Sequence, residues 1–247
     1  MALMRTANPA LNSQTFAGAG NVSADEAMTL QGTVNRTGIL LALLVAASVL
    51  AWSQGPTAKL LQWTGIWAIA GFVVGLFTVF VKKAAPITAP VYAVLEGLVV
   101  GGISLFFELQ YPGIVIQAVA LTFGTLAALL IVYTSRLIPV TQNFRLGVVA
   151  ATGGIAILYL VDLGMGFFLH RSIPMIHESG LFGIGFSIFV VIIAALNLVL
   201  DFDFIENGSR TGQPKYMEWY AGFGLIVTLV WLYLEILRLL AKTRRRR

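Results

Sequence analysis

The sequence has no cysteine, which excludes disulfide bonds, thiolate metal sites and a thiol nucleophile. It is also poor in charge: Asp, Glu, Lys and Arg make up only 11% of the 247 residues, whereas 58% are hydrophobic. With a mean hydropathy of +0.86, this composition is typical of proteins that cross a lipid bilayer several times. We therefore predict an integral membrane protein.

Three common enzyme motifs are missing as well. The sequence contains no Gly-x-x-x-x-Gly-Lys phosphate loop, no His-Glu-x-x-His zinc helix and no Gly-x-Ser-x-Gly nucleophile elbow. We accordingly expect neither catalytic activity nor a bound cofactor. The net charge of +5 comes largely from the arginines at 244–247, and no basic and aromatic surface accompanies them. We expect this tail to face anionic lipids and not to bind nucleic acid.

Seven apolar stretches are long enough to be membrane-spanning helices, because crossing ~30 Å of hydrocarbon takes about 20 helical residues. The sequence therefore predicts an all-α, polytopic membrane domain at 36–242. A polar segment, 1–35, precedes this domain, and a basic tail, 243–247, follows it. The predicted spans are 37–53, 62–81, 90–107, 114–133, 146–168, 181–203 and 219–240.

The polar N-terminal segment contains one helix-start signal. Ser23-Ala24-Asp25-Glu26 has the spacing of a capping box, which predicts a short helix running toward Asn35 along the membrane surface. The first twenty residues are expected to be disordered.

Small residues recur every four positions in the third span, at Ala89, Ala93, Gly97 and Gly101. Such a stripe lets another helix approach closely, so we expect it to be a packing surface within a compact bundle.

The basic residues leave the orientation of the last span open. With seven full crossings, the 16 lysines and arginines divide into eight on each side of the membrane. If the last helix were re-entrant, the division would be fourteen against two, as the positive-inside rule prefers. We expect a cytoplasmic N-terminus under both alternatives.

Carboxylates near the end of the sixth span are the first candidate functional residues, because charge in a bilayer is costly. Asn197 and Asp201 are four residues apart and share one helical face. Asp203 lies about 200° round the helix from Asp201, so only one of the two can face the bundle core, and Asn197 favours Asp201. The alternative is that both aspartates sit in water at the helix end.

Glu235 lies in the last span after sixteen uncharged residues, roughly 24 Å along that helix. A simple structural alternative is an ion pair with Arg238, three residues later on the same helix. The two interpretations are compatible, because Thr228, Trp231, Glu235 and Arg238 share one face.

Glu96 in the third span and Asp162 in the fifth are further candidates. Carboxylates without a nearby basic residue in the interior of a helix bundle are typical of an ion or proton path.

Two motifs make the sequence recognisable: Asp201-Phe202-Asp203-Phe204-Ile205 and Leu232-Tyr233-Leu234-Glu235-Ile236-Leu237. Together they resemble the paired signature of the Bax inhibitor-1 family, also called the transmembrane Bax inhibitor motif family, in which Asp-Thr-Gln-x-Ile is followed by Leu-Tyr-Leu-Asp-Ile. Further segments are similar to its divergent, YccA-like bacterial branch: Met28-Thr29-Leu30-Gln31-Gly32-Thr33-Val34-Asn35, Tyr111-Pro112-Gly113-Ile114-Val115 and Glu218-Trp219-Tyr220.

The resemblance implies a seven-helix bundle with the last helix at its centre, located in a bacterial inner membrane. It also implies a pH-sensitive calcium leak that is gated by one carboxylate on each of the last two helices, here Asp201 and Glu235. Two carboxylates held close in low dielectric share a proton and titrate as a pair, so the pair can act as a proton-biased gate. The sequence departs from the family pattern by Phe202-Asp203 and by the longer Glu235.

Two details of this gate remain open at the sequence level. Oxygen ligands of Asp201, Asp203 and Glu96 are candidates for holding Ca²⁺, the expected permeant ion, in passing. The offset of Asp201 and Glu235 from the connecting loop is roughly 20 Å, which makes Glu218 an alternative partner for Asp201.

Two rival functions remain. The first is a membrane interaction protein that transports nothing and modulates a membrane protease or a stress response, for which residues 1–35 would matter and the carboxylates would not. The second is a proton-coupled carrier that depends on Glu96 and Asp162, although the internal repeat usual in carriers is not apparent.

Overall fold

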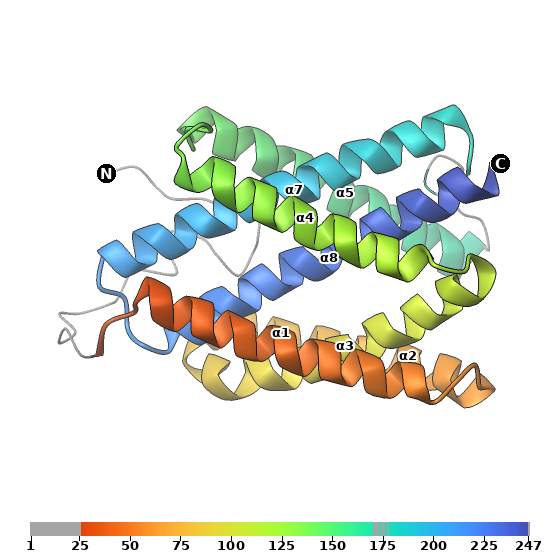
Figure 1. Ribbon diagram of the computed structural model, residues 1–247, viewed down its shortest axis with the longest axis horizontal. Coiled ribbons are helices and arrows are strands. Elements are labelled where there is room, and N and C mark those ends of the chain that lie inside the picture. Colours follow the sequence, from red (N-terminus) through yellow and green to blue (C-terminus); the bar gives the residue numbers. More distant parts are fainter. Residues whose placement is uncertain (1–25, 170–172, 174–175, 177, 247) are drawn as a thin grey trace.

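Seven long α-helices run back and forth along the longest axis of the molecule (Figure 1). The computed structural model describes residues 26–169, 173, 176 and 178–246. Each of the seven helices is long and apolar enough to cross a membrane, and together they account for all seven predicted spans. They are α1 (Leu30–Ser53), α2 (Ala58–Phe80), α3 (Ala85–Gln110), α4 (Ile114–Thr134), α5 (Gln142–Leu169), α7 (Leu181–Arg210) and α8 (Met217–Arg245).

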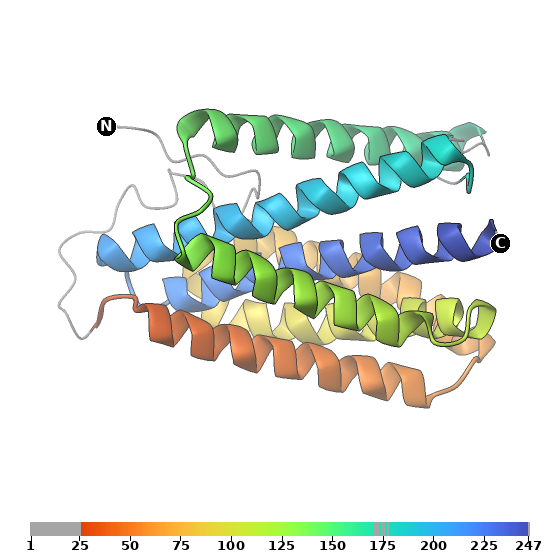
Figure 2. The same ribbon diagram turned by 45° about the horizontal axis from the view of Figure 1, so that its top comes forward.

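The last helix, α8, is the centre of the bundle, as the family resemblance implied. It packs against α1, α3, α4 and α7, and Figure 2 shows it running between α7 on one side and α1 on the other. In the most apolar stretch of α8, 67% of the residues are buried, compared with 50% in the corresponding stretches of α3 and α7. Helices α2 and α5 lie at the periphery, where their apolar side chains face the surroundings.

Helix α8 is continuous through its two glycines, Gly222 and Gly224. It starts at the same end of the bundle as α1 and ends at the opposite end (Figure 1). The re-entrant alternative is therefore not what the structure has, and residues 243–245 of the basic tail form the last turn of α8, at the end opposite to the start of α1. The close packing of α8 in the core explains this, because a partial crossing would leave its apolar surface without partners.

The N-terminal part of the membrane domain differs from the prediction. Helix α1 begins at Leu30, with Thr29 as its N-cap, and runs without a break into the first span. The residues expected to form the second half of a separate surface helix are thus the first turns of α1. Ser23 and the first twenty residues lie outside the described part of the chain.

The small-residue stripe on α3 packs against α1 as predicted. A Cβ atom added to Gly97 would lie 2.3 Å from the Leu44 carbonyl oxygen, and one added to Gly101 would lie 2.4 Å from that of Ser48. The two backbones are close enough for the Ser48 hydroxyl to donate a hydrogen bond to the Gly97 oxygen at 2.9 Å. This contact fixes α1 and α3 as a unit against which α8 packs.

Candidate functional site

Asp201 is fully buried between α7 and α8, with 0% of its surface exposed. Neither of its carboxylate oxygens has a hydrogen-bond partner among the residues that the structure describes. Thr228 on α8 faces Asp201, and its hydroxyl donates to the Gly224 oxygen at 3.3 Å. The carboxyl group of Asp201 thus lies in an apolar interface whose one neighbouring hydroxyl is turned to the backbone.

Asp203 lies on the other side of α7 and forms an ion pair. Its Oδ2 atom is 2.6 Å from Nη2 of Arg145 at the start of α5, and it also accepts a hydrogen bond from Asn207 at 3.0 Å. Helical phase therefore separates the two aspartates as predicted. The alternative in which both sit in water at the helix end is wrong, because α7 continues to Arg210.

Asn197 is buried one turn before Asp201 but does not bind it. Its Nδ2 atom donates to the Thr152 hydroxyl on α5 and to the Ile193 carbonyl, each at 2.8 Å. The predicted polar face of α7 exists, and it connects α7 to α5 through Asn197.

Glu235 lies at the junction of α5 and α8 in a compact polar cluster. Its carboxylate accepts a hydrogen bond from the Tyr159 hydroxyl at 2.9 Å and two from Nη1 of Arg238, at 2.8 and 3.0 Å. The same Nη1 atom donates to the Tyr159 oxygen at 2.8 Å. The ion pair expected from the sequence is confirmed, and Tyr159 joins it to α5.

The predicted direct pair of Asp201 and Glu235 is not formed. Asp201 precedes the end of α7 by nine residues, whereas Glu235 follows the start of α8 by eighteen. Asp201 is consequently level with Thr228, seven residues or about 10 Å before Glu235. Seven residues are two helical turns, so Asp201 and Glu235 lie along the same side of α8 at different depths.

Glu218 is not the alternative partner of Asp201 either. It is buried at the start of α8, where it accepts hydrogen bonds from the Thr29 amide at 3.1 Å and the Thr29 hydroxyl at 3.0 Å. Nζ of Lys215 lies 3.8 Å away and Nε of Arg36 lies 3.9 Å away. Glu218 thereby attaches the start of α1 to the start of α8.

The three residues predicted to hold a cation are not brought together. Glu96 lies on α3 beside Tyr92 and opposite Gly71, while Asp201 and Asp203 point away from each other. The described residues contain no cluster of three or more acidic or histidine side chains that could hold a metal ion. Asp162 is also elsewhere, accepting a hydrogen bond from the Ile173 amide at 2.7 Å.

Two participants were missed at the sequence level. Tyr159 stands three residues before Asp162, and only its tertiary contact with Glu235 distinguishes it from other tyrosines in the spans. Lys242, one turn beyond Arg238, is buried and donates to the Gly183 oxygen at 2.9 Å and the Ser187 hydroxyl at 2.8 Å. Its position directly after the apolar residues Leu239–Ala241 could have suggested that it belongs to the last helix.

The arrangement contains a buried carboxyl group that can take up and release a proton, and a separate ionic cluster that ties the central helix to α5 and α7. No curated protein and no solved structure matches the chain significantly. A family model described as Bax inhibitor 1 like matches residues 8–245, which is nearly the whole chain. The protein therefore belongs to the Bax inhibitor 1 like family of membrane proteins.

Proposed function

We propose that the protein is a pH-sensitive cation leak channel in which Asp201 is the proton-binding group of the gate. The observation that carries this proposal is the full burial of Asp201 without a hydrogen-bond partner for either oxygen among the described residues. The family resemblance supplies the class of activity, with Ca²⁺ as the permeant ion, a bacterial inner membrane as the location and a cytoplasmic N-terminus.

The packed interface between α7 and α8 limits the charge that Asp201 can carry. A neutral carboxylic acid is tolerated between α7 and α8, whereas an unpaired carboxylate there is strongly unfavourable. The other acidic groups on these two helices are already engaged: Asp203 with Arg145, Glu206 with Arg136 and Arg210, Glu218 with Thr29, and Glu235 with Arg238. Loss of the Asp201 proton therefore favours separation of the two helices and entry of water and cations.

The cluster around Glu235 has a different role in this proposal. It holds α8 to α5 about two turns from Asp201, so the two sites are coupled through the rigid central helix and do not share a proton. Weakening the cluster should make the same gate easier to open. In place of a proton shared by Asp201 and Glu235, the proposal has Asp201 as the proton-binding group. Glu235, Arg238 and Tyr159 form a separate latch.

The test is Ca²⁺ flux into liposomes that contain the full-length protein, measured across a pH series. The packed state suits protonated Asp201, so flux should rise as the pH increases and the proton is lost. Couplings of this kind typically change an equilibrium by roughly 5–150-fold. Asp201→Asn, a permanently neutral replacement, should keep flux at its low-pH level throughout the series.

Asp203→Asn is the matched control, because it makes the same chemical change two residues away at a carboxylate that already has Arg145 as its partner. It should retain the pH profile. If Asp201→Asn and Glu235→Gln both leave flux and its pH dependence unchanged, the gate is refuted.

The rival, a modulator of a membrane protease, is separated from the channel by truncation. Residues 26–35 hold α1 against α8, so the deletion should remove only 1–25. A channel should keep its flux after this deletion. If the deletion abolished an effect on a membrane protease but left Ca²⁺ flux unaltered, the interaction protein would be favoured.

A further inference from the structure

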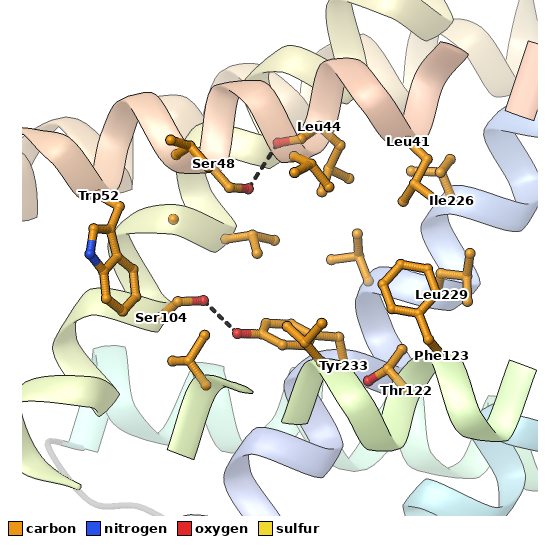
Figure 3. Close-up of a pocket in the computed structure, with 17 residues that line it drawn as sticks. Leu41, Leu44, Ser48, Trp52, Ser104, Thr122, Phe123, Ile226, Leu229 and Tyr233 are labelled. Carbon is orange, nitrogen blue, oxygen red and sulfur yellow. Dashed lines mark hydrogen bonds between the residues drawn. The ribbon is translucent and has the colours of Figure 1, made fainter. Parts of the chain in front are cut away.

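A cavity of about 360 Å³ lies between α1, α3, α4 and α8 (Figure 3). Its lining residues on α8 are on the side opposite to Thr228, which faces Asp201. Helices α3 and α8 form its floor, and α1 and α4 form its walls. Cavities of 300–1,000 Å³ are typical of small-molecule sites in proteins. This one is lined almost wholly by aliphatic and aromatic side chains, including Leu41, Leu44, Ile226 and Leu229.

The few hydroxyl groups in the lining are already engaged. Ser104 and Tyr233 hydrogen-bond to each other at 2.6 Å, as Figure 3 shows. Ser48 donates to the Leu44 oxygen at 2.9 Å, and Thr122 to the Ala118 oxygen at 2.8 Å. Water needs several free polar partners to occupy a cavity, so hydrocarbon suits this lining better.

The cavity opens sideways, toward the lipid. Helices α1 and α4 barely touch over their described lengths, and the opening between them is bordered by exposed apolar side chains. Val49 on α1 is 61% exposed and Phe123 on α4 is 41% exposed. Both belong to membrane-spanning helices, so the molecules that meet this opening are the acyl chains of the bilayer.

One end of the cavity lies beneath the basic C-terminal residues. Val115, in the first turn of α4, lines the cavity, and the turn just before it contains Pro112. Nη1 of Arg244, in the last turn of α8, donates to the Pro112 oxygen at 2.8 Å, which places this arginine at the same end. Glu108 is also here, and its carboxylate accepts hydrogen bonds from the Gly113 and Val115 amides.

We infer that this cavity binds one acyl chain of an anionic phospholipid, whose headgroup lies against Arg244. The apolar lining takes the chain, the lateral opening admits it from the bilayer, and the adjacent cation selects the charge of the headgroup. The bound chain packs against Ile226 and Leu229, on the side of α8 opposite to Thr228 and Asp201. The site does not depend on the proposed gate.

Photolabelling of the full-length protein in lipid nanodiscs tests this site. The nanodiscs contain phosphatidylglycerol or phosphatidylcholine with a diazirine at the end of one acyl chain, and labelled peptides are identified by mass spectrometry. With phosphatidylglycerol, label should concentrate on the cavity-lining stretches of α1, α4 and α8. With phosphatidylcholine, cavity labelling should be several-fold weaker.

Matched variants separate the cavity from ordinary lipid contact. Val49→Trp fills the opening and should lower cavity labelling roughly fivefold, the effect of about 1 kcal/mol in binding. Leu50→Trp should leave it unchanged, since Leu50 is the next residue, is 62% exposed and lies outside the cavity. Arg244→Gln should remove the preference for phosphatidylglycerol, whereas Arg246→Gln at the exposed tail should preserve it.

Several results would overturn the inference. Label spread evenly over the lipid-facing sides of α2 and α5 would mean annular lipid only. Equal labelling of the Val49→Trp and Leu50→Trp variants, or equal labelling by the two lipids, would each exclude the proposed occupant. Ion flux is not measured, so failure here is distinct from failure of the proposed gate.

Discussion

The carboxylates inside this helix bundle differ in whether they have a cationic partner. Glu218, Glu235 and Asp203 each have a cation within 4 Å, and each joins two helices. Asp201 has no such partner among the residues described. A buried charge is tolerable only when it is paired and hydrogen-bonded, so the three paired groups fit structural roles, whereas Asp201 is the group to which the proposed gate assigns the proton.

Glu218→Gln is predicted to destabilise the protein. The carboxylate is 1% exposed and accepts two hydrogen bonds from Thr29, and removing a buried charged acceptor costs about 1–3 kcal/mol. Glu178→Gln, at an exposed position, should change the free energy of unfolding by no more than about 0.5 kcal/mol. Denaturant unfolding in detergent micelles measures both. Equal stability of the two variants would show that the contact between α1 and α8 does not depend on this carboxylate.

At the scale of elements, the closest helix contact is that of α1 with α3. Gly97 and Gly101 let the α3 backbone meet carbonyl oxygens of α1, and Ala47 and Ala51 fill the remaining space. In lipid there is little hydrophobic driving force between helices, so this fit supplies much of the association energy. The α1–α3 unit then supports α8 from one side, while α7 covers the other.

Gly97→Ala should weaken this contact. The new methyl group would lie 2.3 Å from the Leu44 oxygen and 2.8 Å from the Ala47 Cβ atom, and overpacking of this kind costs about 1–3 kcal/mol. Gly124→Ala on α4 is the control, because an added Cβ there meets nothing within 4 Å and alanine favours the helix. Thermal denaturation should rank Gly97→Ala below the wild type and Gly124→Ala at or above it. A Gly97→Ala protein as stable as wild type would mean that α1 can shift freely along α3.

At the scale of the whole molecule, the complete crossing of α8 determines the sidedness of the basic residues. The crossing places Arg244–Arg246 at the end opposite to Lys82 and Lys83, so the basic residues in the described part of the chain do not gather on one side. Loop charge biases the orientation of a helix, whereas displacing α8 would expose the core of the bundle. Packing of the central helix therefore overrides the charge rule.

Single cysteines test this topology directly, because the natural chain has none to interfere. Lys83→Cys and Arg246→Cys both place a thiol at an exposed position. In sealed vesicles of one orientation, a membrane-impermeant maleimide should label only one of the two variants. Labelling of both from the same side would restore the re-entrant last helix.

The sequence was sufficient for the class, the seven spans and the family, because apolar length and local motifs are properties of contiguous residues. It also separated Asp201 from Asp203 and identified the pair of Glu235 with Arg238, since helical phase is fixed by residue spacing. The small-residue stripe on α3 was readable for the same reason.

Only the tertiary structure decided how the helices are placed along one another. The register of α7 against α8 put Asp201 opposite Thr228, away from Glu235, and the packing of α5 brought Tyr159 to Glu235. The start of α1 packs against the start of α8, where Thr29 binds the Glu218 carboxylate. The separation between α1 and α4 leaves the lateral cavity. Register and spacing between helices result from side-chain fit across the whole bundle, which no single stretch of sequence encodes.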